Sequence, residues 1–325
     1  MSVLVFTESA QGRFKKSARE AAYYASKIAK QLGKETIAVA LGTLDAAELA
    51  SIGKSGVAKV LHVNDARFDK FDSGAFTKAI AQAAQKTGAE VVVLSFNNNG
   101  KALGPRLSTR LKAGLVSGVI ALPETGSDFT VKKSVFSGKG FANYTIATPV
   151  KILSLNPNSI QVEQVEQAAA VEPFAVEMSD KDFAVQVVGF EKESAGVPLP
   201  EAEVVVSGGR GLKGPENWGM VEEMAKLLGA ATACSRAVSD VHWRPHHEHV
   251  GQTGLTVRPN LYIAIGISGA IQHLAGVNGS KCIVVINNDP EAPFFKYADY
   301  GIVGDAFDVV PKLNEAFKTY FANNH

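Results

Sequence analysis

The sequence predicts an α/β protein with two parallel-sheet domains, and three observations lead to this fold class. Apolar runs of strand length alternate with amphipathic stretches of helical length along most of the chain, which is the pattern of strands joined by crossover helices. The 325 residues are enough for two domains of ordinary size. A charged stretch with one glycine and two prolines interrupts the alternation and predicts a linker. The expected organisation is an N-terminal domain at 1–190, a linker at 191–202 and a C-terminal domain at 203–325.

The N-terminal domain begins with an alternation typical of a parallel sheet. Strands are expected at 3–6, 36–40, 59–63 and 90–96, with helices at about 15–32 and 74–87. After Gly114 the segments 117–122, 129–136, 144–155 and 183–190 are expected to add strands, and 162–173 to form a surface excursion. The polar and basic stretch 97–110 either contacts a phosphate at a strand end or, the favoured interpretation, helps to shape the domain and its subunit contact.

The C-terminal domain shows strands that end in small or polar residues. They are expected at 203–206, 261–267, 281–286 and 300–303, with a helix at about 216–228. Because the carboxyl ends of parallel strands form the ligand crevice of such a sheet, Ser268, Asn287 and Asp305 are expected to line one edge together. An amide and a carboxylate at this edge suit ribose hydroxyls and the edge of an adenine.

The turn after the second of these strands has the composition of an anion cradle. Ser268 to Ala270 are expected to begin a short helix that runs through Leu274, with Ser268 as its cap and with Gly266 and Gly269 leaving room for a phosphate. The same residues also suit an ordinary strand-to-helix turn. The upstream segment SGGRGLKGPENW adds the cation Arg210, but neither the phosphate-loop motif nor the dinucleotide fingerprint is present.

The chain resembles one known family, the alpha subunit of electron-transfer flavoprotein. The resemblance is carried between Val204 and Val310 by VVSGGRGLKGPEN, CSRAVSD, VGQTG, LYIAIGISGAIQHLAG, INNDPEAPFFKYADYGIVGD and the following VVP, and more loosely by EVVVLSFNNNGKALGPRLSTRLKAG in the N-terminal part. It implies an N-terminal parallel-sheet domain of the nucleotide-hydrolase-like kind, which contacts a beta subunit, and a C-terminal Rossmann-like domain that binds FAD.

The resemblance also implies a set of FAD-binding residues. The segment 268–273 would meet the pyrophosphate, with His273 donating to the pyrimidine carbonyl of the flavin, while Thr253 would hydrogen-bond near N5. Arg236 would lie over the isoalloxazine, where a planar and permanently charged guanidinium supplies a constant field. The full set comprises Arg210 near the diphosphate or ribityl chain, Ser235, Arg236, His249, Val250, Gly251, Gln252, Thr253, Ser268, Gly269, Ala270, Ile271, Gln272 and His273, with Asn287, Asp305 and Ala306 on the adenosine side.

The function that the resemblance implies is that of an electron carrier without catalytic residues of its own. As a heterodimer with the beta subunit, it would take electrons from acyl-CoA dehydrogenases of fatty acid β-oxidation and related dehydrogenases and pass them to a membrane quinone oxidoreductase. Motion about the linker would let FAD approach different partners. The donor dehydrogenase, the flavin potential, and whether the beta subunit holds AMP or a second FAD, as in an electron-bifurcating variant, stay open.

Two alternatives come from other classes of protein. A nucleotide-binding sensor module without redox activity would use a similar sheet and phosphate turn, but it would be colourless. An NAD-dependent enzyme is disfavoured, since the sequence shows neither the standard fingerprint nor an acid and base pair beside a hydride site.

The segment VHWRPHHEHV raises a metal hypothesis, because His242, His246, His247 and His249 lie close together beside Glu248. Adjacent histidines do not easily face one ion, and no cysteine pair accompanies them, so no metal site is predicted. This segment departs most from the family pattern, since His249 stands where many members have glutamine.

Composition adds several exclusions. With 33 basic and 32 acidic residues the net charge is +1, which argues against nucleic acid as the main partner. The longest apolar runs are of strand length, so no membrane insertion is predicted. The N-terminus shows no leader or transit pattern, and a bacterial cytoplasmic protein is expected. Cys234 and Cys282 do not predict a disulfide, and Cys234 is expected to be a buried, inert thiol.

Overall fold

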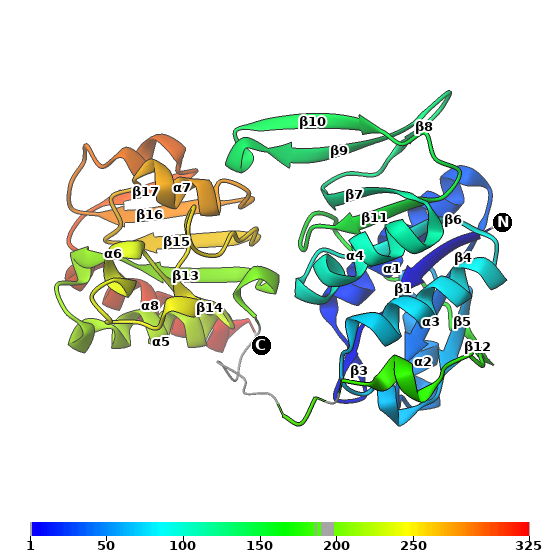
Figure 1. The fold of residues 1–325 in the computed structure, drawn as a ribbon. Helices are drawn as coiled ribbons and strands as arrows, with labels where there is room; N and C mark the ends of the chain where they lie inside the picture. Colours follow the sequence, from blue (N-terminus) through cyan, green and yellow to red (C-terminus); the bar gives the residue numbers. More distant parts are fainter. Residues whose placement is uncertain (1, 186, 190–197, 325) are drawn as a thin grey trace. The chain divides into compact units, whose positions relative to one another are not determined.

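A computed structural model describes residues 2–185, 187–189 and 198–324 of the chain (Figure 1). The chain divides into two units. The N-terminal unit comprises residues 1–135 and 140–190, and the C-terminal unit comprises residues 136–139 and 191–325. Of the predicted linker 191–202, residues 191–197 lie outside the described residues, and the rest contains the short 3-10 helix η5 (Leu199–Glu201).

The N-terminal unit is built on a large sheet whose strand order is β10-β9-β7-β11-β6-β1-β4-β5-β12, with β8 paired to β9. Its strands are β1 (Ser2–Phe6), β4 (Glu35–Leu41), β5 (Lys59–Val63), β6 (Ala89–Ser95), β7 (Gly114–Val119), β8 (Glu124–Thr125), β9 (Phe129–Val135), β10 (Gly140–Thr145), β11 (Lys151–Leu155) and β12 (Ala170–Pro173). A small separate hairpin joins β2 (Ser9–Ala10) to β3 (Arg13–Phe14). The seven neighbouring strands β7-β11-β6-β1-β4-β5-β12 all pair in parallel. Strand β9 pairs antiparallel with β7, β8 and β10.

Helices cover both faces of this sheet (Figure 1). They are α1 (Lys16–Leu32), α2 (Ala46–Ser51), α3 (Ser73–Lys86) and α4 (Asn98–Leu111). Alternate residues of β1 enter different cores: Val3 and Val5 pack with α1, whereas Leu4 and Phe6 pack with α3 and α4. Strands buried on both faces are near-continuous apolar runs, which is why the sequence located them closely.

The predicted strand at 183–190 is wrong for the part that the structure describes; residues 186 and 190 lie outside it. Phe183 ends the 3-10 helix η4 (Asp180–Phe183), and its ring lies edge-on to Phe68 at 5.3 Å and under the Arg67 guanidinium at 4.2 Å. The segment cannot pair with β5, because β12 already occupies that edge. The predicted surface excursion at 162–173 is largely exposed, as expected, but its last residues form this strand.

The stretch 97–110 forms helix α4, which the sequence analysis did not predict. Asn97 caps it, since its Oδ1 accepts a hydrogen bond from the Gly100 amide at 2.9 Å. Asn97 and Asn99 donate side-chain hydrogen bonds of 2.6 and 2.7 Å to the buried carboxylate of Glu8, and Lys15 pairs with the same carboxylate. Asn97 and Asn99 therefore bind a carboxylate of the chain itself.

The C-terminal unit contains a five-stranded, fully parallel sheet with the order β14-β13-β15-β16-β17. Its strands are β13 (Val204–Gly208), β14 (Ala231–Cys234), β15 (Leu261–Ile265), β16 (Ile283–Asn287) and β17 (Tyr300–Val303), and its helices are α5 (Gly219–Leu228), α6 (Arg236–Ser239), α7 (Ile271–Val277) and α8 (Ala306–Asn323). One core packs α7 on the sheet, and the other packs α5 and α8 on the opposite face. The winding direction reverses between β13 and β15, where such sheets bind ligands.

Short 3-10 helices complete the structure. They are η1 (Ile52–Ser55), η2 (Ala66–Phe68), η3 (Phe136–Gly138), η6 (Arg210–Leu212), η7 (Pro215–Asn217), η8 (His246–Glu248) and η9 (Pro293–Tyr297). Within the described part of the chain, no helix has both the length and the apolar character needed to cross a membrane.

Candidate functional site

The residues predicted to bind a ligand lie on loops and helix starts at the carboxyl edge of the C-terminal sheet. At the switch point the loops after β13 and β15 meet backbone to backbone, with hydrogen bonds from the Gly209 amide to the Ile265 carbonyl at 2.9 Å and from the Gly211 amide to the Gly266 carbonyl at 3.0 Å. A Cβ on Gly209 would lie 2.2 Å from the Gly266 oxygen. Glycine is therefore required here for the loops to approach each other.

The loop 250–254 is fixed against α7. The Gln252 amide donates a 2.7 Å hydrogen bond to the carbonyl of Gln272, and a Cβ on Gly276 would lie 2.5 Å from the Gly251 nitrogen. The side chains of Gln252 and Thr253 remain exposed. Two segments that are separate in the sequence and were predicted to face one ligand are thus brought together by their backbones.

The end of β14 joins the same loop cluster. The Ser235 amide donates to the Gly208 carbonyl at 3.1 Å, and the Val250 amide donates to the Cys234 carbonyl at 3.1 Å. Arg236 follows, with a side chain that is 64% exposed and whose Nε lies 3.3 Å from a carboxylate oxygen of Asp240. An exposed cation next to the loop 250–254 can meet a planar or anionic ligand from solvent.

His273 lies in the core beneath this cluster. It is 6% exposed, its Nε2 is 2.9 Å from the Tyr262 hydroxyl, and its ring stands 5.7 Å from that of Phe294. Its Nδ1 is buried near the Val250 backbone and makes no hydrogen bond of good geometry with described residues. Burial lowers the pKa of His273 to about 4, so the ring is neutral near pH 7. Both nitrogens therefore face the protein, with Nε2 next to the Tyr262 hydroxyl and Nδ1 enclosed near the Val250 backbone.

His249 supports the loop 250–254 from below. The residue is 2% exposed, and a Cβ on Gly254 would lie 2.3 Å from its carbonyl oxygen and 2.7 Å from its Nδ1. That Nδ1 has no hydrogen-bond partner among the residues that the structure describes. Burial and the nearby His246 and Arg236 lower the pKa of His249, against an opposing effect of Asp240.

The turn before α7 differs from the prediction. The residues Ser268 to Ala270 are not helical; α7 begins at Ile271, with Ala270 as its N-cap residue and without a side-chain cap. Gly269 has φ +82°, and a Cβ there would lie 2.4 Å from the Cβ of Phe294. The left-handed backbone of Gly269 keeps the turn out of the helix, and the expected capping role of Ser268 is wrong. The side chains of Ser268, Ala270, Ile271 and Gln272 are exposed.

At the ends of β16 and β17 the polar side chains form hydrogen bonds with backbone groups of the protein. Asn287 donates to the Ile267 carbonyl at 3.0 Å. Asp305 caps α8 through a 3.0 Å hydrogen bond from the Phe307 amide, and this bond, followed by Lys213, lowers the pKa of its carboxyl. Ala306, the first residue of α8, is buried.

Lys213 also lies at the candidate site, although it was not among the predicted site residues. Its Nζ lies 3.4 Å from Asp305 and 4.6 Å from the centre of the Phe307 ring. The same glycine-rich turn places Arg210 at the exposed start of η6. The basic composition of that turn was the available signal.

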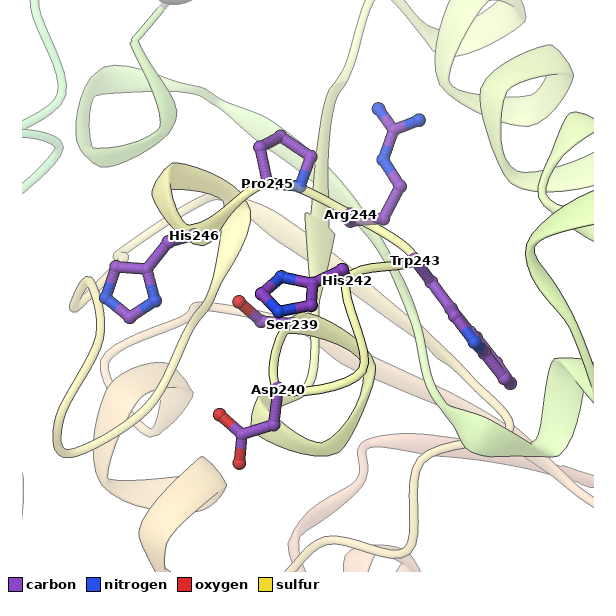
Figure 2. A pocket seen from close by; sticks show the side chains of 7 residues that line it. All are labelled: Ser239, Asp240, His242, Trp243, Arg244, Pro245 and His246. Carbon is purple, nitrogen blue, oxygen red and sulfur yellow. The ribbon is translucent and has the colours of Figure 1, made fainter.

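The histidine-rich segment surrounds an open hollow of about 490 Å³, lined by Ser239, Asp240, His242, Trp243, Arg244, Pro245 and His246 (Figure 2). Its cation Arg244 is neutralised by Glu248 at 2.6 Å and Glu222 at 2.9 Å. Within the described residues, no group of three His, Cys, Asp or Glu side chains is arranged to hold a metal ion.

Burial raises the pKa of the Cys234 thiol to about 12, which keeps it protonated.

Comparisons with known proteins agree over both units. The model of the electron transfer flavoprotein domain matches residues 3–180, and that of the electron transfer flavoprotein FAD-binding domain matches residues 198–278. The electron transfer flavoprotein subunit alpha of Bacillus subtilis (strain 168) is 39% identical over 265 residues, 81% of each chain. That of Syntrophomonas wolfei subsp. wolfei is 36% identical over 315 residues, 97% of this chain and 98% of the relative. Protein FixB of Escherichia coli O81 is 35% identical over 291 residues, 89% of this chain and 92% of the relative.

Proposed function

The chain belongs to the electron transfer flavoprotein alpha-subunit family, and from this premise we propose that it carries electrons on an FAD held at the carboxyl edge of its C-terminal sheet. FAD is the cofactor of the domain family that matches this unit. The loop cluster around Arg236, Thr253 and Gln272 is the part of the edge that we assign to the flavin ring, and the turn 268–270 is the part that we assign to the diphosphate.

The residues present fit such a ligand. The observation that carries the assignment is the junction of the loop 250–254 with the start of α7 through the Gln252–Gln272 backbone hydrogen bond. Around this junction lie exposed donors, a cation that is 64% exposed, and the exposed apolar side chain of Ile271. The rings of His249 and His273 are buried below this junction. A large planar group with polar edges would contact the exposed members of this set.

Bound FAD would supply reversible acceptance of electrons, which protein side chains do not provide. The protein would then bind and tune. Arg236 would hold a positive charge at every working pH where negative charge builds up on reduction. The first amides of α7, together with Arg210 and Lys213, would offer donors and charge to the diphosphate. Asn287 and Asp305 would meet the adenosine end.

The partners follow from the family. The relatives carry the name subunit alpha, and we infer that this chain also works with a beta subunit as a heterodimer. We assign the contact with that subunit to the N-terminal unit and the cofactor to residues 203–325. The proposed donors are acyl-CoA dehydrogenases and related dehydrogenases, and the proposed acceptor is a membrane quinone oxidoreductase; an electron-bifurcating role is the variant to be tested alongside.

The test is the visible spectrum of the full chain, co-expressed with its beta subunit, as FAD is added and then reduced stepwise with dithionite. We expect a yellow, reversibly reducible protein, and weaker FAD binding for Arg236→Ala. The exposed residue Lys226 on α5 provides a control that removes one positive charge from the same unit, and Lys226→Ala is expected to bind FAD as the wild type does. A complex that stays colourless after FAD is added would overturn the proposal in favour of a nucleotide sensor.

A further inference from the structure

Asp240 lies next to Arg236, the cation that we assign to the flavin ring. Asp240 is not among the predicted site residues. We propose that Asp240 is a positioning residue for Arg236, and that its charge sets how strongly the C-terminal unit prefers reduced over oxidised FAD. This inference rests on the proposed function of the same site. It concerns a carboxylate that would oppose the charge that Arg236 supplies.

The contact geometry links the two residues directly. Arg236 Nε lies 3.3 Å from Asp240 Oδ2, and the Asp240 amide donates a 2.8 Å hydrogen bond to the Arg236 carbonyl. The two residues are four apart across α6, so their side chains lie on the same side of this turn. Asp240 thus restricts the directions available to the guanidinium and cancels part of its charge.

The buried ring of His249 lies near this pair of charges and under the loop 250–254. The charged and titratable groups near the ring are His246 and Arg236, which lower the pKa of His249, and Asp240, which raises it. His249 in turn lowers the pKa of the neighbouring His273. The ring lies directly under Gly254. Charges that are felt below the loop are also felt by a ligand on its exposed side.

The other ionic groups of the segment do not compensate for Asp240. Arg244 is paired with Glu248 and Glu222, and it stacks on Trp218 at 5.4 Å. Figure 2 shows the side chains of Trp243 and Arg244 pointing away from Asp240 and His246. A change at Asp240 therefore alters the balance of charge at Arg236 without disturbing this second network.

Solvent exposure explains why the pair would matter mainly in the loaded protein. The side chains of Arg236 and Asp240 are 64% and 59% exposed, so water screens their interaction when the site is open. A flat ligand lying over Arg236 would exclude that water and strengthen every nearby charge interaction. The carboxylate would then disfavour the added negative charge of reduced FAD.

The decisive experiment measures the midpoint potential of FAD in the full chain, co-expressed with its beta subunit, for wild type, Asp240→Asn and Asp240→Glu. We expect Asp240→Asn to bind reduced FAD about tenfold more tightly relative to oxidised FAD, a rise of about 30 mV for a two-electron couple. Asp240→Glu keeps the charge and is expected to restore most of the wild-type value. An unchanged or lower potential in Asp240→Asn overturns the inference.

A matched control and a cofactor-independent readout separate this inference from its premise. Glu315 on α8 also pairs with a cation in its own helix, Lys318 at 2.7 Å, and Glu315→Gln is expected to leave the potential unchanged. In the FAD-free protein, NMR titration should show a lower pKa of His249 in Asp240→Asn than in wild type; an unchanged value contradicts the proposed reach of this charge. Failure of every variant and the wild type to bind FAD would instead overturn the proposed function.

Discussion

His273 and Tyr262 share a hydrogen bond inside the core of the C-terminal unit, and its energy depends on the protonation of the histidine. The ring is 6% exposed, and its pKa is lowered from 6.5 to about 4 by burial. A histidine whose pKa is lower in the folded than in the unfolded chain makes its full contribution to stability at a pH above the pKa of the unfolded state. This stability is lost as the pH falls from about 6.5 towards 4, because the unfolded chain then binds the proton more readily.

We therefore expect the C-terminal unit to lose about 2 kcal/mol of stability through His273 between pH 7 and pH 5, from about 1.4 kcal/mol per pH unit below 6.5. Urea unfolding followed by tryptophan fluorescence measures this, since Trp218 and Trp243 both lie in this unit. In His273→Gln, which is less stable at pH 7, that part of the pH dependence should be missing. Parallel pH profiles for the two proteins would contradict the assignment.

Gly269 is required by the fold of the turn before α7. Its φ of +82° and the 2.4 Å approach of Phe294 leave no room for a side chain. We expect Gly269→Ala to destabilise the C-terminal unit by at least about 2 kcal/mol, combining backbone strain with a steric clash. The change is measured by urea unfolding without FAD.

Gly219 provides the control for this substitution, because a Cβ there would meet nothing within 4 Å. Gly219→Ala should leave stability unchanged or slightly raised. Equal stabilities of the two variants would show that the turn before α7 can relax around a side chain.

At the scale of elements, the segment that follows β12 binds firmly to the N-terminal unit although it is not a strand. The Gln82 side chain pairs with both backbone groups of Glu177, with its Oε1 accepting from the amide at 2.8 Å and its Nε2 donating to the carbonyl at 3.1 Å. Lys78 pairs with Asp182 at 2.7 Å, and Phe183 packs between Phe68 and Arg67. Side-chain contacts thus replace a β-ladder here.

Phe183→Ala is expected to destabilise the N-terminal unit by about 2 kcal/mol, less than a fully buried phenylalanine would cost. Val188 is 94% exposed, and Val188→Ala should have no measurable effect. Far-UV circular dichroism in urea measures both variants. If Val188→Ala were as damaging as Phe183→Ala, the segment would be held by contacts other than those of the Phe183 ring.

The strands buried on both faces could be predicted from sequence, whereas α4 could not. Three residues of α4 argue against a helix: Gly100, Gly104 and Pro105. The structure gives the physical reason for the first two. A Cβ on Gly100 would lie 1.7 Å from the Ser95 oxygen, and Gly104 packs against Leu115. Tertiary packing selected these glycines, and a single sequence does not show it.

Part of the candidate site could also be predicted from sequence. The rule that the carboxyl ends of parallel strands share one edge of the sheet predicts that Ser268, Asn287 and Asp305 lie along the same edge. It could not reveal the pairing of Lys213 with Asp305 or of Asp240 with Arg236, because these contacts depend on the path of loops. It also could not show that His249 is buried under its loop.

At the scale of the whole molecule, the two units should report separately on unfolding. Both tryptophans lie in the C-terminal unit, whereas helices of both units contribute to circular dichroism. We expect the fluorescence transition, and the share of the circular dichroism change that belongs to the C-terminal unit, to move when FAD is added, by about 2.7 kcal/mol at a free concentration of 100 times the dissociation constant, while the share of the N-terminal unit stays in place. An equal shift of every transition would show that the units unfold as one.

The carboxylate of Glu8 makes the switch point of the N-terminal sheet different from that of the C-terminal sheet. The strand order of its sheet reverses direction between β1 and β6, and the carboxylate of Glu8, just past the end of β1, is held there by Asn97, Asn99 and Lys15. The donors that an incoming phosphate would need are already satisfied, and a fixed negative charge would repel it. Among the described residues, the switch point of the first sheet is thus occupied by a carboxylate of the chain itself.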